Sequence, residues 1–494
     1  MSRHSSRAVR RAPILAVLAA ALLAGALFDR AGGPAGSGQP VVETVQPMPV
    51  AAPAAALSSS WFCAGATDGG TVPMPGKVVV ANDSSQAVTG TVTVVGSSAK
   101  PRRVPVSVPA YGVATVAETV PGGSQWVGAI VDLDGGSVGV DQVDHGPLGR
   151  STTPCATSGS PHWYLPSGQT RVNADEAIIL LNPYHSGSVV DLTFTTDQGI
   201  EVPQAFQAIY VPPGGLVGVD VGSQLRRRSA IAATVSTQSG SVVAFQTSWV
   251  TQAPAGVPLV GTPAASSPLA DPAAPSQGST VTLGAPSAGR SWVWPDGLAG
   301  DGINEKYVIY NPGPRPADVR LSIGLQQGSA EPFSLNVGPY QVATVVSEQS
   351  ARIPPGVAHS ATLTSVNGVP VVAARVITAT NASAPGGTRN GIGQLLGARL
   401  SASRWLLPAA LSGAAHHGHV VVYNPGVAPV KAHLSALHSG TGTFTTVPAA
   451  GRVDIPLPAG VSFPVELQAS GPVYVEYDLY GATGLSLSLG IPLS

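Results

Sequence analysis

The stretch that decides the fold is Trp405-Leu406-Leu407-Pro408, followed nineteen positions after the Trp by Asn424-Pro425-Gly426. An apolar run, residues 420–423, leads into that Asn. The earlier copies of this pattern are Trp61 with Asn82, Trp163 with Asn182 and Trp292 with Asn311. The spacing is again nineteen in two of these copies and twenty-one in the first. An internal repeat of this length indicates a chain built from several similar units.

Composition narrows the fold class and the partners. The 494 residues are 44% apolar and 10% charged, with a net charge of −1, so several domain cores are possible and a basic nucleic-acid-binding face is not indicated. The chain contains 59 Gly and 46 Pro, which favour short strands joined by turns. We therefore expect an all-β protein with no nucleic-acid partner.

The amino terminus predicts export. Residues 1–11 form a basic tail, and residues 12–28 are an uncharged apolar run whose length lies between a secretory signal and a membrane span. We expect a single-pass membrane anchor with the basic end in the cytoplasm and the C-terminal region outside. Cleavage of the segment and secretion are the alternative. Residues 29–58, rich in Ala, Gly and Pro, are expected to be an extended tether.

Beyond the tether, each copy of the pattern is followed by alternating apolar residues, as at Val104, Val106 and Val108, which are typical of half-buried strands. Two apolar runs then flank a turn such as Asp134-Gly135-Gly136, which predicts a closing β-hairpin. The sequence thus predicts four tandem immunoglobulin-like β-sandwich repeats. Their expected ranges are 59–153, 154–254, 280–395 and 396–494. Residues 255–279, rich in Ala, Pro and Ser, predict a flexible linker that would act as a hinge between two pairs of repeats.

The repeated Trp and Asn residues have a structural explanation. A Trp that recurs at one register is expected to anchor each core, because its ring buries a large apolar area. An Asn before Pro is expected to end a strand, because the following Pro favours an extended conformation at the Asn. The alternative for the Trp residues is a row of open platforms that stack on sugar rings.

Several sequence motifs resemble those of a known protein family. Trp61-Phe62-Cys63, the strand Val78 to Asn82, the Asn-Pro-Gly turns and Pro370 to Ala373 resemble an actinobacterial family of secreted or membrane-tethered proteins built on a β-rich domain of unknown function. The resemblance implies no reaction, ligand or site residue. The first repeat departs from the pattern, because Cys63 and Ala64 stand where the second repeat has Leu165 and Pro166.

Candidate chemistry is sparse. His416, His417 and His419 are expected in a loop and could bind zinc or copper, but no Cys or carboxylate lies near them in sequence. The acidic residues Asp132, Asp134, Asp141 and Asp144 lack the spacing of a calcium loop. No nucleophile elbow or phosphate-binding loop is present. We therefore expect no enzyme activity, no cofactor and no metal.

The two cysteines, Cys63 and Cys155, are predicted to form a disulfide. An exported chain matures where thiols oxidise, and a single pair of cysteines there favours a bridge. Cys63 opens the first repeat and Cys155 follows its last strand, so the bridge would join the two ends of that repeat. The alternative is two free, buried thiols in separate domains.

Two functions fit these observations. The first is a non-enzymatic, membrane-anchored extracytoplasmic envelope protein that presents tandem β-sandwiches to another protein or to the cell wall. The second is a glycan-binding accessory in the assembly of cell-wall polymers. Exposure of the Trp rings would favour the second, and their burial would remove its main support.

Overall fold

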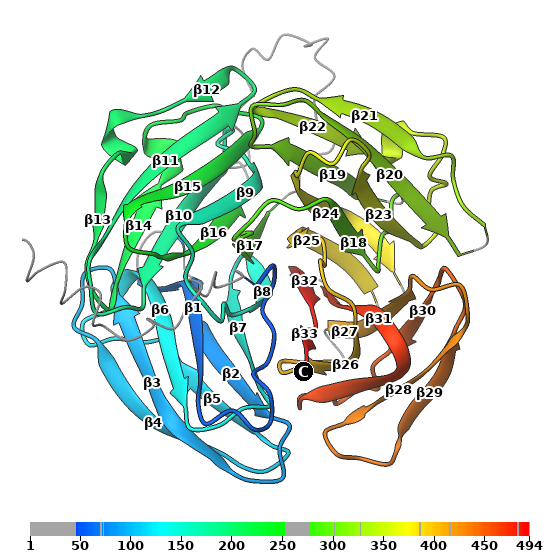
Figure 1. The fold of residues 1–494 in the computed structure, drawn as a ribbon, viewed down its shortest axis with the longest axis horizontal. Helices are drawn as coiled ribbons and strands as arrows, with labels where there is room; N and C mark the ends of the chain where they lie inside the picture. Colours follow the sequence, from blue (N-terminus) through cyan, green and yellow to red (C-terminus); the bar gives the residue numbers. More distant parts are fainter. Residues whose placement is uncertain are drawn as a thin grey trace, which may run out of the picture. The chain divides into compact units, whose positions relative to one another are not determined.

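The computed structural model describes residues 46–493 except 70–71, 73, 252–276, 301, 327, 385–386, 414–415 and 482–483. Most of these residues are in β-strands, and every strand pairing between the named strands is antiparallel. Figure 1 shows the strands in chain order, grouped in successive pairs of sheets. The fold class is therefore all-β. We describe the strands in four segments, residues 59–156, 162–285, 289–398 and 402–493.

The first segment contains two four-stranded sheets. Their orders are β1-β6-β3-β4 and β5-β2-β7-β8. The strands are β1 (Ser59–Asp68), β2 (Gly76–Asn82), β3 (Val88–Gly96), β4 (Arg102–Val108), β5 (Val113–Ala117), β6 (Ser124–Leu133), β7 (Val138–Gly146) and β8 (Gly149–Pro154).

The second segment repeats this order as β9-β15-β11-β12, with β13 also on β11, and β14-β10-β16-β17. Its strands are β9 (His162–Gly168), β10 (Ala174–Asn182), β11 (Ser188–Thr196), β12 (Gly199–Glu201), β13 (Ile209–Val211), β14 (Gly215–Asp220), β15 (Ile231–Ser239), β16 (Val243–Val250) and β17 (Gly278–Leu283). Two short 3-10 helices, η1 (Gln204–Phe206) and η2 (Val221–Ser223), lie between strands.

The third segment has the orders β18-β23-β20-β21 and β22-β19-β24-β25. Its elements are β18 (Ser291–Trp294), β19 (Ile303–Asn311), β20 (Ala317–Leu325), β21 (Phe333–Val337), β22 (Gln341–Val346), η3 (Ser347–Gln349), β23 (His359–Ser365), β24 (Val372–Ala384) and β25 (Gly387–Leu396).

In the fourth segment one long strand, β31, pairs in both sheets and so joins them. The pairings otherwise follow the same order, β29-β28-β31-β26 and β30-β27-β31-β32. The strands are β26 (Ala402–Leu407), β27 (His416–Asn424), β28 (Val430–Ala436), β29 (Gly442–Val447), β30 (Gly451–Pro456), β31 (Val465–Gly481), β32 (Gly484–Leu489) and β33 (Ile491–Pro492).

The expected closing hairpins are wrong. β6 and β7, which flank Asp134-Gly135-Gly136, do not pair with each other, because β6 pairs with β1 and β3 while β7 pairs with β2 and β8. The same holds for β15 and β16 and for β23 and β24, whereas β31 passes between the sheets without a break. These runs are apolar because each is an inner strand of its sheet, and a short turn carries the chain from one sheet to the other.

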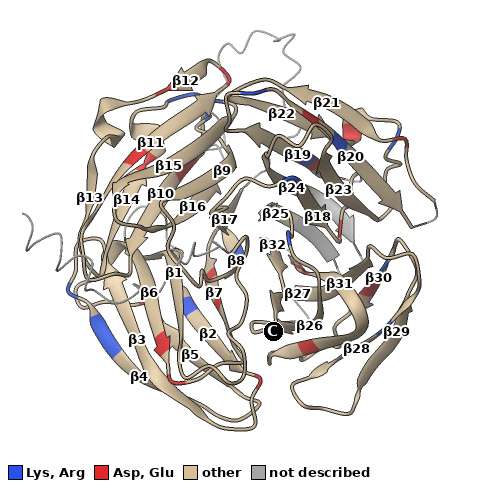
Figure 2. Ribbon diagram, viewed as in Figure 1, with Lys and Arg blue, Asp and Glu red and all other residues tan. Residues whose placement is uncertain are grey.

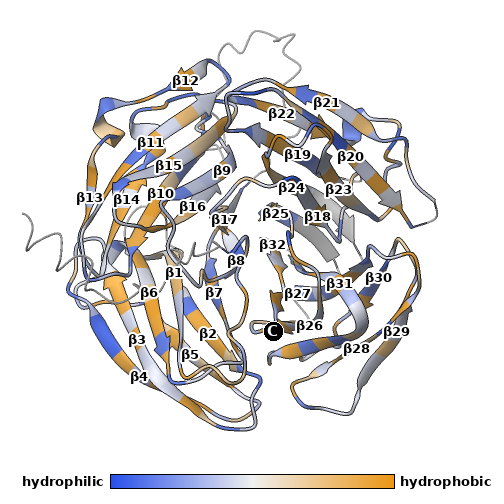
Figure 3. Ribbon diagram, in the orientation of Figure 1, coloured by the Kyte–Doolittle hydropathy of each residue, from blue (hydrophilic) through white to orange (hydrophobic). Residues whose placement is uncertain are grey.

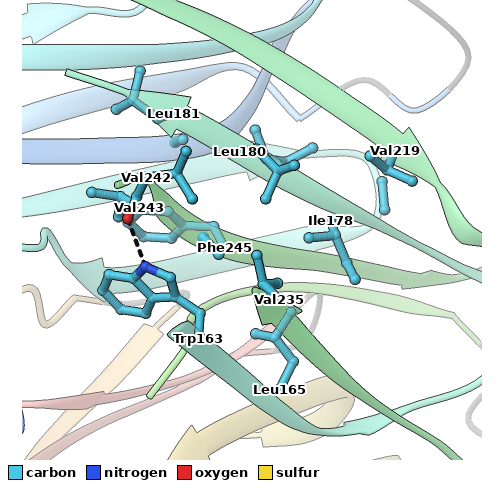
Figure 4. Close-up of a cluster of buried hydrophobic side chains, with 14 of the residues drawn as sticks. Trp163, Leu165, Ile178, Leu180, Leu181, Val219, Val235, Val242, Val243 and Phe245 are labelled. Carbon is cyan, nitrogen blue, oxygen red and sulfur yellow. Dashed lines mark hydrogen bonds between the residues drawn. The ribbon is translucent and has the colours of Figure 1, made fainter. Parts of the chain in front are cut away.

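Apolar side chains fill the space between the sheets. Along many strands, apolar residues alternate with polar ones (Figure 3). Figure 4 shows the core of the second segment, where Trp163 lies among Leu165, Val235 and Phe245. The burial of such rings and branched chains is the main driving force for a fold with so few charges.

A recurring clasp closes each segment. The residue after each repeated Trp pairs with a residue that follows the last strand of the segment's second sheet. The pairs are Phe62 with Ala156, Tyr164 with Ala285, Val293 with Ala398 and Leu406 with Ile491. The position before each partner is Cys155, Gly284, Gly397 or Gly490. Gly is required at 397, because an added Cβ would lie 2.8 Å from the Cβ of Trp292.

The clasp corrects the expected boundaries. Gly284 and Gly397 close the second and third segments, although the sequence placed them at the start of the third and fourth repeats. β17 pairs with β16 of the second segment, so the boundary expected at 280 falls inside a strand. Most of the expected linker, 255–276, lies outside the described residues, but its last residues, Gly278 and Ser279, belong to β17.

The strands that close the second sheet of each segment, β8, β17, β25 and β32, contact one another in a closed cycle (Figure 1). β17 contacts β8 and β25, and β32 contacts β25 and β8. Hydrogen bonds support three of the four contacts: Val281 N to Ser151 Oγ at 2.9 Å, Thr282 Oγ1 to the Gln394 carbonyl at 3.4 Å, and Thr152 N to Ser486 Oγ at 2.8 Å. Residues 45–494 form one compact unit.

The end of the expected tether is also folded. Met48 is buried with the core of the fourth segment, and Ala51 donates its N–H to the Pro492 carbonyl at 3.0 Å. Ala52 accepts a hydrogen bond from Ser137 N at 2.9 Å. Residues 46–53 thus bond to the first segment at Ser137 and to the fourth segment at Pro492, instead of extending freely. The small side chains in this stretch permit the close approach of the main chains. The rest of the tether, 29–45, lies outside the described residues.

No helix among the residues that the structure describes is long and apolar enough to cross a membrane. The apolar run 12–28 lies outside those residues, as does the basic tail 1–11.

Candidate functional site

The four repeated Trp rings are buried. Trp61 and Trp405 are 0% exposed, Trp292 is 1% and Trp163 is 2%. Trp163 Nε1 donates to the Val242 carbonyl at 2.6 Å, as the dashed line in Figure 4 shows, and Trp292 Nε1 donates to the Val371 carbonyl at 3.0 Å. The Trp residues therefore cannot serve as open platforms for sugar rings.

The four repeated Asn residues are buried at the ends of β2, β10, β19 and β27. Each side chain accepts a backbone N–H two residues on and donates to the carbonyl four residues on. For Asn311 the partners are Gly313 N at 3.0 Å and the Arg315 carbonyl at 2.7 Å, and Nδ2 also reaches the Val337 carbonyl at 3.0 Å. Asn82, Asn182 and Asn424 make the corresponding bonds. The Asn side chain thus fixes the turn, which the sequence argument attributed to the Pro alone.

The structure contains the Cys63–Cys155 disulfide, with an S–S length of 2.02 Å and a Cα–Cα distance of 4.7 Å. Both cysteines are 0% exposed. The bridge lies beside the Phe62–Ala156 clasp, where the N–H groups donate at 2.8 and 2.9 Å. In the first segment the disulfide therefore reinforces a contact that the other segments make with hydrogen bonds.

The three histidines occupy a strand, not the expected loop. His416, His417 and His419 all lie on β27, where His419 Nδ1 is 3.1 Å from Asp454 Oδ1. Across the described residues, no three His, Cys, Asp or Glu side chains converge as a group that could hold a metal ion.

The four acidic residues of the first segment separate into two kinds. Asp132 and Asp134 accept hydrogen bonds from Ser60 and Thr89 at exposed positions. Asp141 and Asp144 are buried on β7, and burial raises their pKa values to about 7 and about 8. They do not form one calcium site.

An unexpected cluster, which we call the buried ion network, lies where the third and fourth segments meet. Arg375 of β24 is 2.5 Å from Glu476 and 3.7 Å from Asp478, both on β31. Arg452 of β30 is 2.6 Å from Asp296, which follows β18. The side chains of Arg375, Glu476 and Asp478 have no exposed surface.

The ion network continues into the third segment. His359 Nε2 lies 2.8 Å from Glu305 Oε2, and Ser347 Oγ donates to the same oxygen at 2.7 Å. The Tyr307 hydroxyl is 3.2 Å from His359 Nε2. Charged residues are few in this chain (Figure 2), so their concentration here is notable.

Burial and charge act against each other in this network. Burial would lower the pKa of Arg375, but Glu476 and Asp478 outweigh it and hold the pKa well above its usual value. Burial, the largest single cause, would raise the pKa of Asp296, but Arg452, the hydrogen bond with Asp478 and Arg375 together outweigh it and lower the pKa. Burial, together with Glu476 and Asp296, raises the pKa of Asp478 well above its usual value.

Perturbed pKa values often mark active sites, but ion pairs that only support a fold perturb them too. The side chains of Arg375, Glu476, Asp478, Glu305 and His359 have no exposed surface, and those of Arg452 and Asp296 are 5% and 9% exposed, so the network offers no open site to a substrate. The network is therefore best explained as a polar contact between two segments. The signal in the sequence was a charged residue inside an apolar strand, as at Arg375 and Glu305.

A second unexpected feature, which we call the outer groove, crosses β29, β28 and β31 on the face that points away from the core. Its volume is about 520 Å³. One side carries Phe444, His433 and Gln468, and the other carries Thr446 and Lys431. Ala432, Thr445 and Ala469 lie between them. No pattern in the sequence indicates this groove, because its residues follow ordinary strand alternation.

Comparisons with known proteins identify a family whose function is unknown. A family described as "Family of unknown function (DUF5719)" matches residues 141–390. No curated protein matches the chain.

Three solved structures show weak similarity. "Thermotoga maritima 1070" is 19% identical, with 23% of this chain and 95% of that chain covered and a TM-score of 0.20. The α-L-rhamnosidase of Streptomyces avermitilis, complexed with L-rhamnose, is 9% identical, with 82% and 55% covered and a TM-score of 0.13. A tetra-tandem repeat from the extending region of a large adhesion protein is 12% identical, with 83% and 93% covered and a TM-score of 0.11. None of these TM-scores shows a common fold.

The family match, in contrast, spans just over half of the 494 residues. The chain therefore belongs to the family of unknown function DUF5719.

Proposed function

We propose that the four segments are four tandem immunoglobulin-like β-sandwich units. The order of strands supports this, because each segment places its first strand beside the same inner strand and closes its second sheet with its last strand. Two antiparallel sheets that pack over an apolar core are the defining feature of such a unit.

The protein acts, in this proposal, as a non-enzymatic envelope protein of an actinobacterium, anchored in the cell membrane by residues 12–28. Its β-sandwiches face outside the cytoplasm and bind another protein or the cell wall. The observation that carries the proposal is the buried Cys63–Cys155 disulfide, because such bridges form and persist in oxidising compartments. The buried ion network supports a role without catalysis, since its titratable groups are buried or nearly so.

Protease treatment of intact spheroplasts tests the location. We expect the strands beyond residue 58 to be degraded while cytoplasmic proteins survive. Full protection of these strands would contradict the proposal. Mass spectrometry of the mature amino terminus distinguishes the two forms of export. A terminus near Leu27 would show that the segment is cleaved and the protein secreted, whereas an intact terminus would support the membrane anchor.

A pull-down from native membranes with the purified region beyond residue 58 tests the role. We expect an envelope protein or a wall polymer to be retained. Turnover of a wall polymer by the purified protein would contradict a non-enzymatic role.

A second candidate is a glycan-binding accessory in cell-wall polymer assembly. The Trp rings no longer support it, because all four are buried. The outer groove does favour it, since an exposed aromatic ring lies there beside hydrogen-bonding side chains.

A further inference from the structure

We propose that the outer groove binds a neutral saccharide chain, with one sugar ring packed on the free face of Phe444. This inference rests on the proposed extracytoplasmic location, because only there would the groove meet the glycans of the envelope. It deepens the second candidate function by naming the ligand class and the residues that hold it.

Phe444 is the feature that requires explanation. Its side chain is 72% exposed, although a Phe ring normally gains from burial. One face stacks on the His433 ring, with the centroids 3.9 Å apart and the planes within 5°. β29 is the last strand of its sheet, so no neighbouring strand covers the ring on the other side. An aromatic face is thus open to solvent.

The stack with His433 fixes the orientation of that face. The two residues are direct partners across β28 and β29, which keeps the rings in register. Gly442 lies close to the same histidine, where an added Cβ would be 2.8 Å from His433 Nε2 and 2.2 Å from the Leu434 carbonyl oxygen. A ring held in this way loses little conformational entropy when a ligand binds.

Polar side chains line the rest of the groove, where the sugars that follow the one on Phe444 would lie. Gln468 is the direct partner of His433 on β31, and its Nε2 donates to Glu466 at 3.0 Å, so its carbonyl oxygen can accept from a ligand. Lys431 and Thr446 are partners on the opposite side of the groove, and both are exposed. The three strands span about 10 Å, two strand spacings, which suits a short stretch of oligosaccharide.

The balance of chemistry favours a neutral glycan over other ligands. Lys431 is the one cation among the residues that line the groove, so a polyanion would find little charge to neutralise. The groove exposes a single flat ring and no deep apolar pocket of the kind that holds a peptide side chain. An apolar ring face with a few placed hydrogen-bonding groups matches a pyranose, which has an apolar face and a rim of hydroxyls.

Affinity electrophoresis of the purified region beyond residue 58 tests this inference, in gels that contain soluble mannan, β-glucan, xylan, galactan or the soluble glycan fraction of the host envelope. We expect at least one polymer to retard the wild type. Phe444→Ala should weaken that binding by about tenfold or more, because the stacked face is lost. Phe444→Tyr keeps a flat ring and should retain binding.

Phe463→Ala is the matched control. Phe463 lies in the same segment, is 43% exposed and is not part of the groove, so its removal should leave binding unchanged. Circular dichroism and thermal unfolding of all three variants show whether each is folded.

Three results would overturn the inference. They are no retardation of the wild type by any polymer, equal loss in Phe444→Ala and Phe463→Ala, and a protein partner that needs Phe444 and is not displaced by these glycans. The protease test on spheroplasts is independent of all three, so a failed groove and a failed location can be told apart.

Discussion

Arg375 of β24 and Glu476 of β31 form an ion pair at 2.5 Å in which neither side chain has any exposed surface. The two residues belong to the third and fourth segments, so this pair joins segments and not strands of one sheet. Replacing a buried pair by apolar groups is often neutral, but removing one partner leaves a buried charge without compensation. We therefore expect the removal of one partner to cost more stability than the replacement of both.

Arg375→Met should lower the free energy of unfolding by about 3 to 5 kcal/mol, because Glu476 loses its cation in a site closed to water. The double variant, Arg375→Met with Glu476→Gln, should lose less free energy of unfolding than the single variant Arg375→Met. Urea unfolding measures both. Arg352→Met is the control, since Arg352 pairs with Glu331 at an exposed site, and it should change stability by less than about 1 kcal/mol. Equal effects at the two arginines would contradict the assignment.

Glu176 makes stability depend on pH. Burial raises its folded pKa to about 8 from an ordinary value of 4.5, although Gln246 opposes the shift. Between these values the folded chain keeps a proton that the unfolded chain releases, so stability falls as the pH rises from about 4.5 to about 8. Glu176→Gln should make the decline shallower, with Asp141 and Asp144 accounting for part of what remains, measured as the unfolding midpoint against pH.

Glu201→Gln provides the control of opposite sign. Arg228 lowers the pKa of Glu201, so the native Glu201 contributes stability at neutral pH that is lost as the pH falls through the folded pKa. Its replacement should leave the decline between pH 4.5 and pH 8 intact. An unchanged profile for Glu176→Gln would show that this carboxyl does not hold its proton in the folded state.

The double replacement Cys63→Ala with Cys155→Ala should lower stability by about 4 to 5 kcal/mol in the chain-entropy model for a loop of about 100 residues. The closed loop here separates the cysteines by 92 positions. Urea unfolding of the two oxidised proteins gives the difference. Reduced wild type should match the variant, and coincident unfolding curves for oxidised wild type and variant would count against a stabilising bridge.

Asn311→Ala should cost about 2 to 3 kcal/mol, because the Arg315 and Val337 carbonyls and the Gly313 N–H lose a buried partner together. Asn336→Ala is the control, since Asn336 bonds to Asp318 at an exposed site. Thermal unfolding compares the two variants. Equal shifts would mean that the repeated Asn does not carry the turn.

Local periodicity was enough to predict the strands and the position of the core. A Trp and an Asn recur at a similar spacing, as at Trp163 and Asn182, because every segment has an aromatic ring in its core and an amide side chain at its first turn. Pairing was harder to predict. The runs on either side of Asp134 are apolar whether they pair with each other or belong to opposite sheets, so the pattern could not separate a hairpin from a crossing between sheets.

The two candidate sites were missed for different reasons. Arg375 meets Glu476 across a sequence separation of 101, and no local pattern reports such a pairing. Phe444 occupies an outward position at which many residue types occur, so its exposure follows only from the strand order. The tether was misjudged because the composition of residues 46–53 describes a chain that cannot form its own core, although it can lie against one formed by others.

β16 and β17 are neighbouring strands of one sheet, although residues 251–277 separate them in the sequence. A cut at residues 252–276 would therefore not divide the protein between domains. It would leave the amino-terminal fragment without its edge strand and the carboxyl-terminal fragment with an unpaired one. The two fragments should reassemble when mixed, and this position is suited to splitting the protein into complementing halves.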